Sequence, residues 1–195
     1  LLALGQPLAS AEQSVRAADA GTEVESHRQL IEGCAKKTAV SLAIRPLQTD
    51  DFPTLFEFHR DPEAVYMAAF TAPNPNDRAA FDAHFLKNMG DPTVILHTIF
   101  ADGLVAGVLF SFIMEGQREV GYWIGRQFWG RGIATAALRL LLTEISERPL
   151  FARAAKDNLG SLRVLEKCGF TIIGEDKGYA NARAAEIEEF ILRHG

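Results

Sequence analysis

The sequence has little cysteine, no excess of basic charge and no long apolar run. Its 195 residues include two cysteines, at positions 34 and 168, with no Cys-x-x-Cys pair or zinc-type histidine spacing, which argues against a zinc site or a disulfide framework. The formal net charge of -5 lacks the basic excess typical of nucleic-acid binding. The apolar start, residues 1–8, is too short for a membrane span and lacks a signal peptide's basic segment. We therefore expect a cytoplasmic protein with no metal, nucleic-acid or membrane partner.

The remaining composition is that of one ordinary domain. Hydrophobic residues make up 48% of the chain and charged residues 23%, and the length is sufficient to bury a core. Residues 1–38 are rich in Ala, Glu and Ser and contain few large apolar side chains, so we expect a poorly structured or helical extension. Residues 39–195 form the predicted domain.

Apolar periodicity and turn residues predict alternating helices and strands within that domain. Helices are expected within residues 49–60, 63–70, 80–89, 132–148 and 159–168. Strands are expected at 40–47, 94–100, 104–114, 119–125, 150–155, 170–174 and 186–192. The strands from 94 to 125 are joined by short turns and predict an antiparallel meander. The strand-helix-strand unit over 119–155 predicts a right-handed crossover between parallel neighbours.

A glycine-rich turn, Gln127-Phe128-Trp129-Gly130-Arg131-Gly132, joins a predicted strand to a predicted helix. The first N–H groups of a helix have no partner in the helix and lie at its positive end, so such a turn predicts an anion site. Gly130 and Gly132 would allow a diphosphate to approach the backbone, and Arg131 could add a charged hydrogen bond. A plain structural turn is the alternative, because Gly-x-Gly alone is a weak signal.

Two common phosphate-binding patterns do not fit this turn. A dinucleotide-binding fingerprint requires a third glycine where this chain has Thr135, and no acidic residue ends a second strand about twenty residues later. A Walker-type loop requires Gly-Lys followed by Ser or Thr, and the sequence contains no Gly-Lys pair.

Two segments together resemble the GCN5-related N-acetyltransferases, the GNAT family. Gly121-Tyr122-Trp123-Ile124 with Gln127-Phe128-Trp129-Gly130-Arg131-Gly132-Ile133-Ala134-Thr135 resembles the family's coenzyme A motif. The block from Asn158 to Phe170 resembles its Asn-x-x-Ser...Glu-Lys-x-Gly-Phe segment. The aromatic-Ile-x-x-x-x-Trp-Gly-x-Gly pattern points to the ribosomal-protein alanine acetyltransferase (RimJ/RimL)-like branch. The resemblance implies an α/β (α+β) three-layer fold, with a mixed, mostly antiparallel twisted sheet of about seven strands flanked by helices.

The resemblance also implies a coenzyme A site. Backbone amides of the turn would bind the pyrophosphate, the end of the preceding strand would pair with the pantetheine arm, and Asn158 would hydrogen-bond that arm. A helix N-cap is the alternative role for Asn158. The implied cofactor-binding residues are Trp123, Ile124, Trp129, Gly130, Arg131, Gly132, Ile133, Ala134, Thr135, Asn158 and Ser161.

Transfer to an amine requires a base, because a lysine-like amine with pKa near 10.4 is mostly protonated at neutral pH. Glu119 is the preferred candidate, with Glu115 as a substitute, and His84 and His97 are interpreted as structural. Many relatives have a Tyr directly before the Glu-Lys pair as the acid, where this chain has Leu165. Ser161 is left to hydrogen-bond the departing thiolate.

The predicted function is transfer of the acetyl group of acetyl-CoA to a primary amine, without a metal. A protein N-terminus is the leading acceptor by resemblance to the branch. A polyamine, amino acid or aminoglycoside is the alternative, and a non-catalytic coenzyme A-binding module is a third possibility. Phe56, Tyr66, Met67 and Phe70 are candidate walls of the acceptor site. Exposed sheet edges are compatible with a homodimer.

Overall fold

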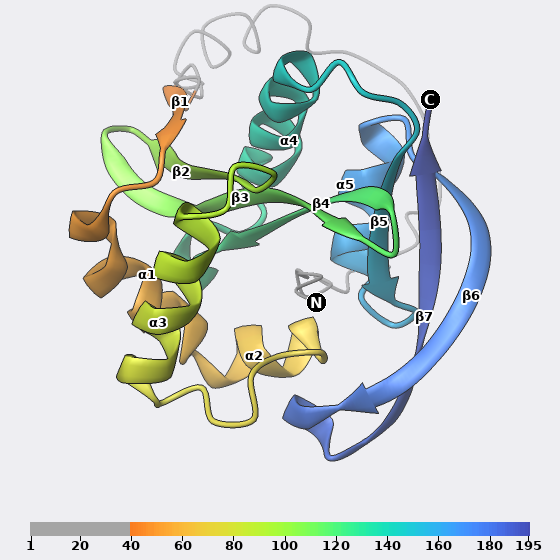
Figure 1. The fold of residues 1–195 in the computed structure, drawn as a ribbon, viewed down its shortest axis with the longest axis horizontal. Helices are drawn as coiled ribbons and strands as arrows, with labels where there is room; N and C mark the ends of the chain where they lie inside the picture. The colour runs from red at the N-terminus through yellow and green to blue at the C-terminus, as the bar shows by residue number, and fades with distance from the viewer. Residues whose placement is uncertain (1–39) are drawn as a thin grey trace, which may run out of the picture.

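The computed structural model describes residues 40–195, so the predicted extension at 1–38 lies outside the described residues. The described chain forms a seven-stranded sheet in the order β1-β2-β3-β4-β5-β7-β6 (Figure 1). Its strands are β1 (Leu42–Pro46), β2 (Ile95–Ala101), β3 (Leu104–Met114), β4 (Gln117–Ile124), β5 (Leu150–Ala155), β6 (Thr171–Ala180) and β7 (Ala185–His194). β4 and β5 are parallel, whereas the other neighbours are antiparallel. The predicted mixed, mostly antiparallel sheet is confirmed.

The helices are α1 (Phe52–His59), α2 (Pro62–Ala68), α3 (Arg78–Met89), α4 (Ile133–Glu144) and α5 (Leu159–Lys167), with short 3-10 turns η1 (Thr49–Asp51), η2 (Arg126–Phe128) and η3 (Asn181–Arg183). Two adjacent residues of β4 contact different helices: Trp123 stacks on His59 of α1, and Tyr122 reaches Ser161 of α5. Figure 1 shows α1, α2 and α3 as one group, apart from α4 and α5. The sheet therefore lies between two helical layers.

Apolar patterning explains the central elements. β3 is apolar over most of its length and buried from Ala106 to Ser111, as expected for a strand covered on both faces. α4 buries a stripe at helical spacing that includes Ala134, Leu138 and Leu141. Cys168 is a buried thiol at the end of α5.

Side-chain caps begin three of the helices. Asp61 accepts hydrogen bonds from Glu63 N and Ala64 N at the start of α2, and Asp77 accepts one from Ala80 N at the start of α3. Asn158 caps α5. In contrast, α4 begins at Gly132 without a side-chain cap, so its first N–H groups are available to another acceptor.

Two element ends differ from the sequence prediction by more than two residues. α4 stops at Glu144, whereas a helix to residue 148 was predicted. The Arg148 guanidinium instead donates to the carbonyls of Leu142 and Ile145, which the helix end leaves without partners.

The second difference is β6, which continues to Ala180 beyond the predicted end at 174. Its outer half contains three consecutive charged residues, Glu175-Asp176-Lys177, and pairs with β7 along an exposed hairpin, so it lacks the apolar alternation that reveals a half-buried strand. Among the described helices, none is long and apolar enough to cross a membrane.

Candidate active site

β4 and β5 separate after a short contact. Within the described chain their register contains one Cα pair, Glu119 opposite Phe151. On its other side β4 pairs with β3 along its full length, to Gly107 opposite Ile124. The β4 edge between residues 120 and 124 is therefore left to pair with an extended amide chain.

The glycine turn follows the open end of β4. Gly130 and Gly132 have left-handed backbones, with φ of 71° and 76°. No described atom lies within 4 Å of a Cβ built at either position. The left-handed backbone conformation is by itself a sufficient reason for glycine at both positions. The open space in front of them also adjoins the uncapped start of α4. This arrangement fits a diphosphate bound by backbone N–H groups.

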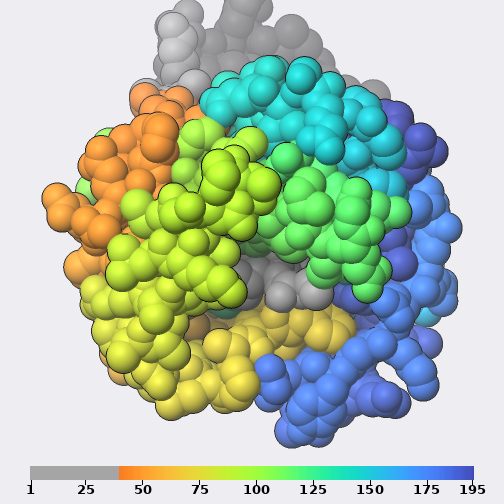
Figure 2. Space-filling view, viewed as in Figure 1, coloured from red at the N-terminus to blue at the C-terminus, as the bar shows by residue number. Residues whose placement is uncertain are grey.

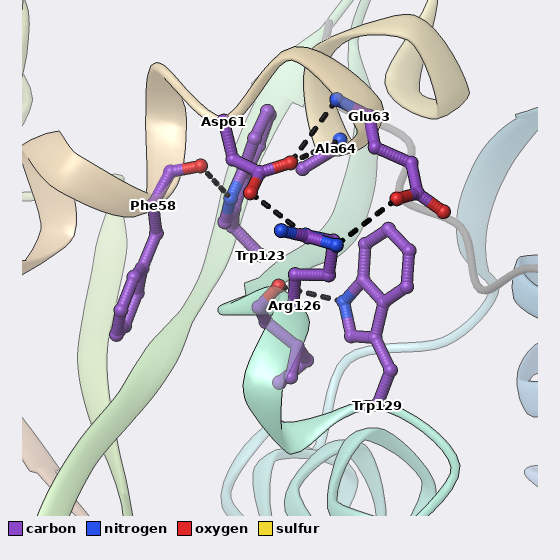
Figure 3. Close-up of polar contacts among 8 residues, drawn as sticks. Phe58, Asp61, Glu63, Ala64, Trp123, Arg126 and Trp129 are labelled. Carbon is purple, nitrogen blue, oxygen red and sulfur yellow. Dashed lines mark hydrogen bonds and ion pairs between the residues drawn. The ribbon is translucent and has the colours of Figure 1, made fainter.

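Hydrogen bonds fix the turn to the rest of the domain (Figure 3). The Trp129 indole donates to Ile124 O at 2.9 Å, which folds the turn back on the end of β4. Arg126 donates to Asp61 at 2.9 Å and to Glu63 at 3.3 Å, both at the start of α2. The turn is therefore tied to the helical layer that contains α1 and α2.

Two of the predicted cofactor-binding groups already have partners. Trp129 N donates to Arg126 O, so the amides available to an anion begin at Gly130. Arg131 forms an ion pair with Asp102, with Nη2 and Oδ2 2.7 Å apart, beside the turn. Both side chains are substantially exposed, so Arg131 can exchange this carboxylate for a phosphate.

Asn158 performs the N-cap role considered as its alternative. Its Oδ1 accepts from Ser161 N at 3.0 Å, and its Nδ2 donates to Met67 O at 3.1 Å. The side chain is fully buried. Because an amide NH₂ has two donors, one N–H is left for a ligand.

Ser161 is buried beneath β4 and accepts a hydrogen bond from the Tyr122 hydroxyl at 3.2 Å. Burial raises the pKa of Tyr122, so the phenol is neutral and acts as a donor. Tyr122 lies within the matching motif, but sequence reasoning gave it no role because its partner is 39 residues away.

Glu119 lies at the β4–β5 contact and is 4% exposed. Arg153 Nε donates to its Oε1 at 3.1 Å, and the same guanidinium contacts Glu189 at 3.1 Å and Asp176 at 2.9 Å. Burial raises the pKa of Glu119 above its ordinary value, although Arg153 opposes the shift. Sequence reasoning missed Arg153 and Glu189, which distant strands bring to this point.

The substitute base, Glu115, has a different setting. It lies in the β3–β4 turn, is exposed and has a φ of 52°. Its carboxylate is solvated at a hairpin tip, whereas that of Glu119 is buried where β4 and β5 meet.

A cavity of about 650 Å³ lies between α1, α3 and the sheet, and its lining includes His59, Phe70, Phe81, Phe112 and Trp123. In Figure 2 the yellow-green residues of α3 and the green β3–β4 hairpin border a hollow. Of the four predicted walls, Phe70 lines the cavity. Tyr66 is instead 54% exposed beneath Arg183. His84, interpreted as structural, also lines the cavity.

Among the described residues, no cluster of three or more His, Cys, Asp or Glu side chains has a geometry suited to a metal ion. The groups that the fold brings together are thus backbone amides, two buried carboxylates that share one arginine, and two hydroxyls.

Comparison with known proteins identifies the family. The profile described as "Acetyltransferase (GNAT) domain" matches residues 41–171, more than half of the chain, and the chain therefore belongs to the GNAT acetyltransferases. The acyltransferase activity and the family predicted from the two motifs are confirmed.

Curated relatives agree with this assignment. "Putative ribosomal N-acetyltransferase YdaF" of Bacillus subtilis (strain 168) is 29% identical over 165 residues, covering 77% of this chain and 90% of that protein. "Uncharacterized N-acetyltransferase p20" of Bacillus licheniformis is 22% identical over 164 residues, with the same coverage.

Solved structures share the fold. RimL, a ribosomal L7/L12 alpha-N-protein acetyltransferase in complex with coenzyme A, is similar with a TM-score of 0.65 and 21% identity, over 77% of this chain and 93% of that one. A spermidine N-acetyltransferase from Vibrio cholerae in complex with CoA and spermine has a TM-score of 0.66 and 15% identity, over 78% and 95%.

Proposed function

We propose that this enzyme transfers the acetyl group of acetyl-CoA directly to a primary amine, with Glu119 as the base. The supporting observation is that the open β4 edge, the uncapped start of α4 and a buried carboxylate converge at the β4–β5 separation. No covalent enzyme intermediate is required, because the amine itself is the nucleophile.

The chain's own groups would bind the cofactor in two parts. Backbone N–H groups from Gly130 to Thr135 would bind the pyrophosphate, with Arg131 adding a charged hydrogen bond. The β4 edge at Trp123 and Ile124 would pair with the pantetheine amides, and Asn158 would use its remaining N–H. When bound, acetyl-CoA supplies the activated thioester.

Proton transfer would use the two buried polar sites beside β4. Glu119 would accept the proton of the amine, directly or through water, and its raised pKa brings it nearer to neutral pH, which improves a general base. On the other face, Tyr122 donates to Ser161, which leaves the Ser161 proton free to hydrogen-bond the leaving thiolate.

The leading acceptor in this proposal is a protein N-terminus. It is supported by the names of YdaF and RimL, which describe acetylation of ribosomal proteins. A small-molecule amine is the second candidate, supported by the spermidine acetyltransferase at a similar TM-score.

The test is release of thiol from acetyl-CoA with a panel of peptides and small amines. We expect at least one amine to exceed the rate of acetyl-CoA hydrolysis. Glu119→Gln should lower turnover at neutral pH at least tenfold and leave coenzyme A affinity unchanged, with the exposed Glu115→Gln as the matched control. Tight coenzyme A binding without amine-dependent thiol release would refute direct transfer and favour a binding module.

A further inference from the structure

The cavity beside α3 opens on the same face of the sheet as Glu119. Residues directly opposite one another on antiparallel strands place their side chains on one face. Phe112 of β3 is opposite Glu119, and Phe110 is opposite Gly121. Phe110, Phe112 and Trp123 line the cavity. The floor of the cavity therefore lies on the same face of the sheet as the proposed base, and Phe112 is the lining residue opposite it.

The walls of this cavity are aromatic. Phe81 and Phe85 of α3 pack with ring centroids 4.7 Å apart, and His59 of α1 stacks on Trp123 at 4.1 Å. Phe70 closes the side next to α2. Rings from two helices, a loop and two strands thus surround a space of about 650 Å³, large enough for an amino acid side chain with part of its backbone.

The inner wall carries no formal charge. His59 Nδ1 lies 2.8 Å from Leu55 O and donates to it, and burial lowers the pKa of His59 to about 4, so the ring is neutral at pH 7. The charged lining residues lie at the exposed rim. Asp77 there is engaged in capping α3, and Asp91 accepts from the Thr93 amide and hydroxyl.

We propose that this cavity selects the acceptor, and that it takes primary amines whose neighbouring group is uncharged and either aromatic or branched aliphatic. The proposal rests on the proposed function, since it requires the acceptor amine to reach Glu119. An apolar group gains from leaving water for an aromatic pocket. A second ammonium, as in a polyamine, would lose its hydration on the inner wall without meeting a carboxylate there, since Asp77 and Asp91 lie at the exposed rim.

A peptide series tests this selection. Five tripeptide amides that differ only in the first residue, Phe, Leu, Ser, Lys or Asp, would be compared with spermidine by thiol release at saturating acetyl-CoA. We expect kcat/KM for the Phe and Leu peptides to be at least tenfold above the other peptides and spermidine. Equal or higher values for the Lys peptide or spermidine would overturn the proposal.

A variant of the cavity and a matched control test whether the cavity is the source of the selectivity. Phe112→Ala should reduce the ratio of kcat/KM between the Phe and Ser peptides at least fivefold. The matched control, Ile173→Ala, removes an apolar side chain that is 54% exposed on β6, outside the cavity lining, and should leave the ratio unchanged. An unchanged ratio in folded Phe112→Ala would move the selective contact elsewhere and contradict the proposal.

Product inhibition of the wild-type enzyme provides a measurement that does not depend on a variant folding. The N-acetylated Phe peptide should inhibit at least tenfold more strongly than the N-acetylated Ser peptide, and equal inhibition would count against an apolar pocket. If no amine in the panel supports thiol release, the proposed function fails. If all are acetylated equally, only the selectivity is refuted.

Discussion

Arg153 Nε and Glu119 Oε1 form a hydrogen-bonded ion pair of 3.1 Å at the place where β4 and β5 meet. The same arginine also contacts Glu189 and Asp176, so one positive charge is shared among three carboxylates. Burial raises the pKa values of both Glu119 and Glu189. The electrostatic environment of the proposed base, Glu119, is thus determined by charged side chains from several strands and not by one neighbour.

Removing the charge of Glu189 should change the pH dependence of the reaction. The Glu189 carboxylate contributes to the raised pKa of Glu119, so Glu189→Gln should lower that pKa. A base works when deprotonated, and activity is lost as pH falls through its pKa. The acidic limb of the kcat/KM profile, expected above the ordinary glutamate pKa of 4.5 in the wild type, should therefore move to lower pH in Glu189→Gln. Glu188→Gln, at an exposed neighbouring position, is the control. If the acidic limb moved to higher pH in Glu189→Gln, the limb would report the titration of a group other than Glu119.

Two glycines with the same backbone conformation give a matched test of the diphosphate site. Gly132 and Gly116 have φ of 76° and 78°, and neither has a described atom within 4 Å of a built Cβ. Alanine at either position should carry a similar conformational cost, about 1 kcal/mol. Only Gly132→Ala would place a methyl group where the diphosphate is expected, so its Kd for coenzyme A should rise at least tenfold by calorimetry. A comparable loss of coenzyme A affinity in Gly116→Ala would show that backbone strain, and not contact with the diphosphate, causes the loss in Gly132→Ala.

Arg131 and Asp102 make a second pair of variants. Arg131→Ala should weaken coenzyme A binding about tenfold at low salt, because a charged hydrogen bond to phosphate is lost, and less at high salt. Asp102→Asn removes the competing carboxylate and should leave the affinity unchanged or stronger. Calorimetry at two ionic strengths would measure both. Equal weakening in the two variants would mean that the ion pair organises the turn without Arg131 binding phosphate.

Asn158 should matter for stability whatever its role in binding. Asn158→Ala removes the α5 cap and leaves the Met67 carbonyl without its partner, with an expected loss of about 2 kcal/mol in the free energy of unfolding. Asp77→Ala removes an exposed cap from α3 and should cost about 1 kcal/mol. Urea denaturation measures both. If Asn158→Ala were no more destabilising than Asp77→Ala, the hydrogen bond to Met67 would make no net contribution to the free energy of unfolding.

The sequence allowed the elements and the position of the glycine turn to be predicted because their signals are local. The apolar run of β3 and the Gly130-Arg131-Gly132 turn lie within short windows, and the predicted bounds of β3 and β5 match the observed ones. The partners of Glu119 could not be predicted, since Arg153 is 34 residues away and Glu189 lies on a later strand. Of the rings around the proposed acceptor cavity, Phe70 was predicted as a wall. The others could not be predicted for the same reason: they come from α1, α3, β3 and β4, and each ring alone is indistinguishable from core packing.

The contacts of Arg126 with Asp61 and Glu63 have an evolutionary consequence. They join the turn after β4 to the first residues of α2 across more than sixty positions of the chain. A charge reversal at any one of the three positions would bring like charges together and displace the turn. Among relatives that keep this geometry, positions 61, 63 and 126 should therefore vary as a set, so that sequence change at the start of α2 is constrained by the turn after β4.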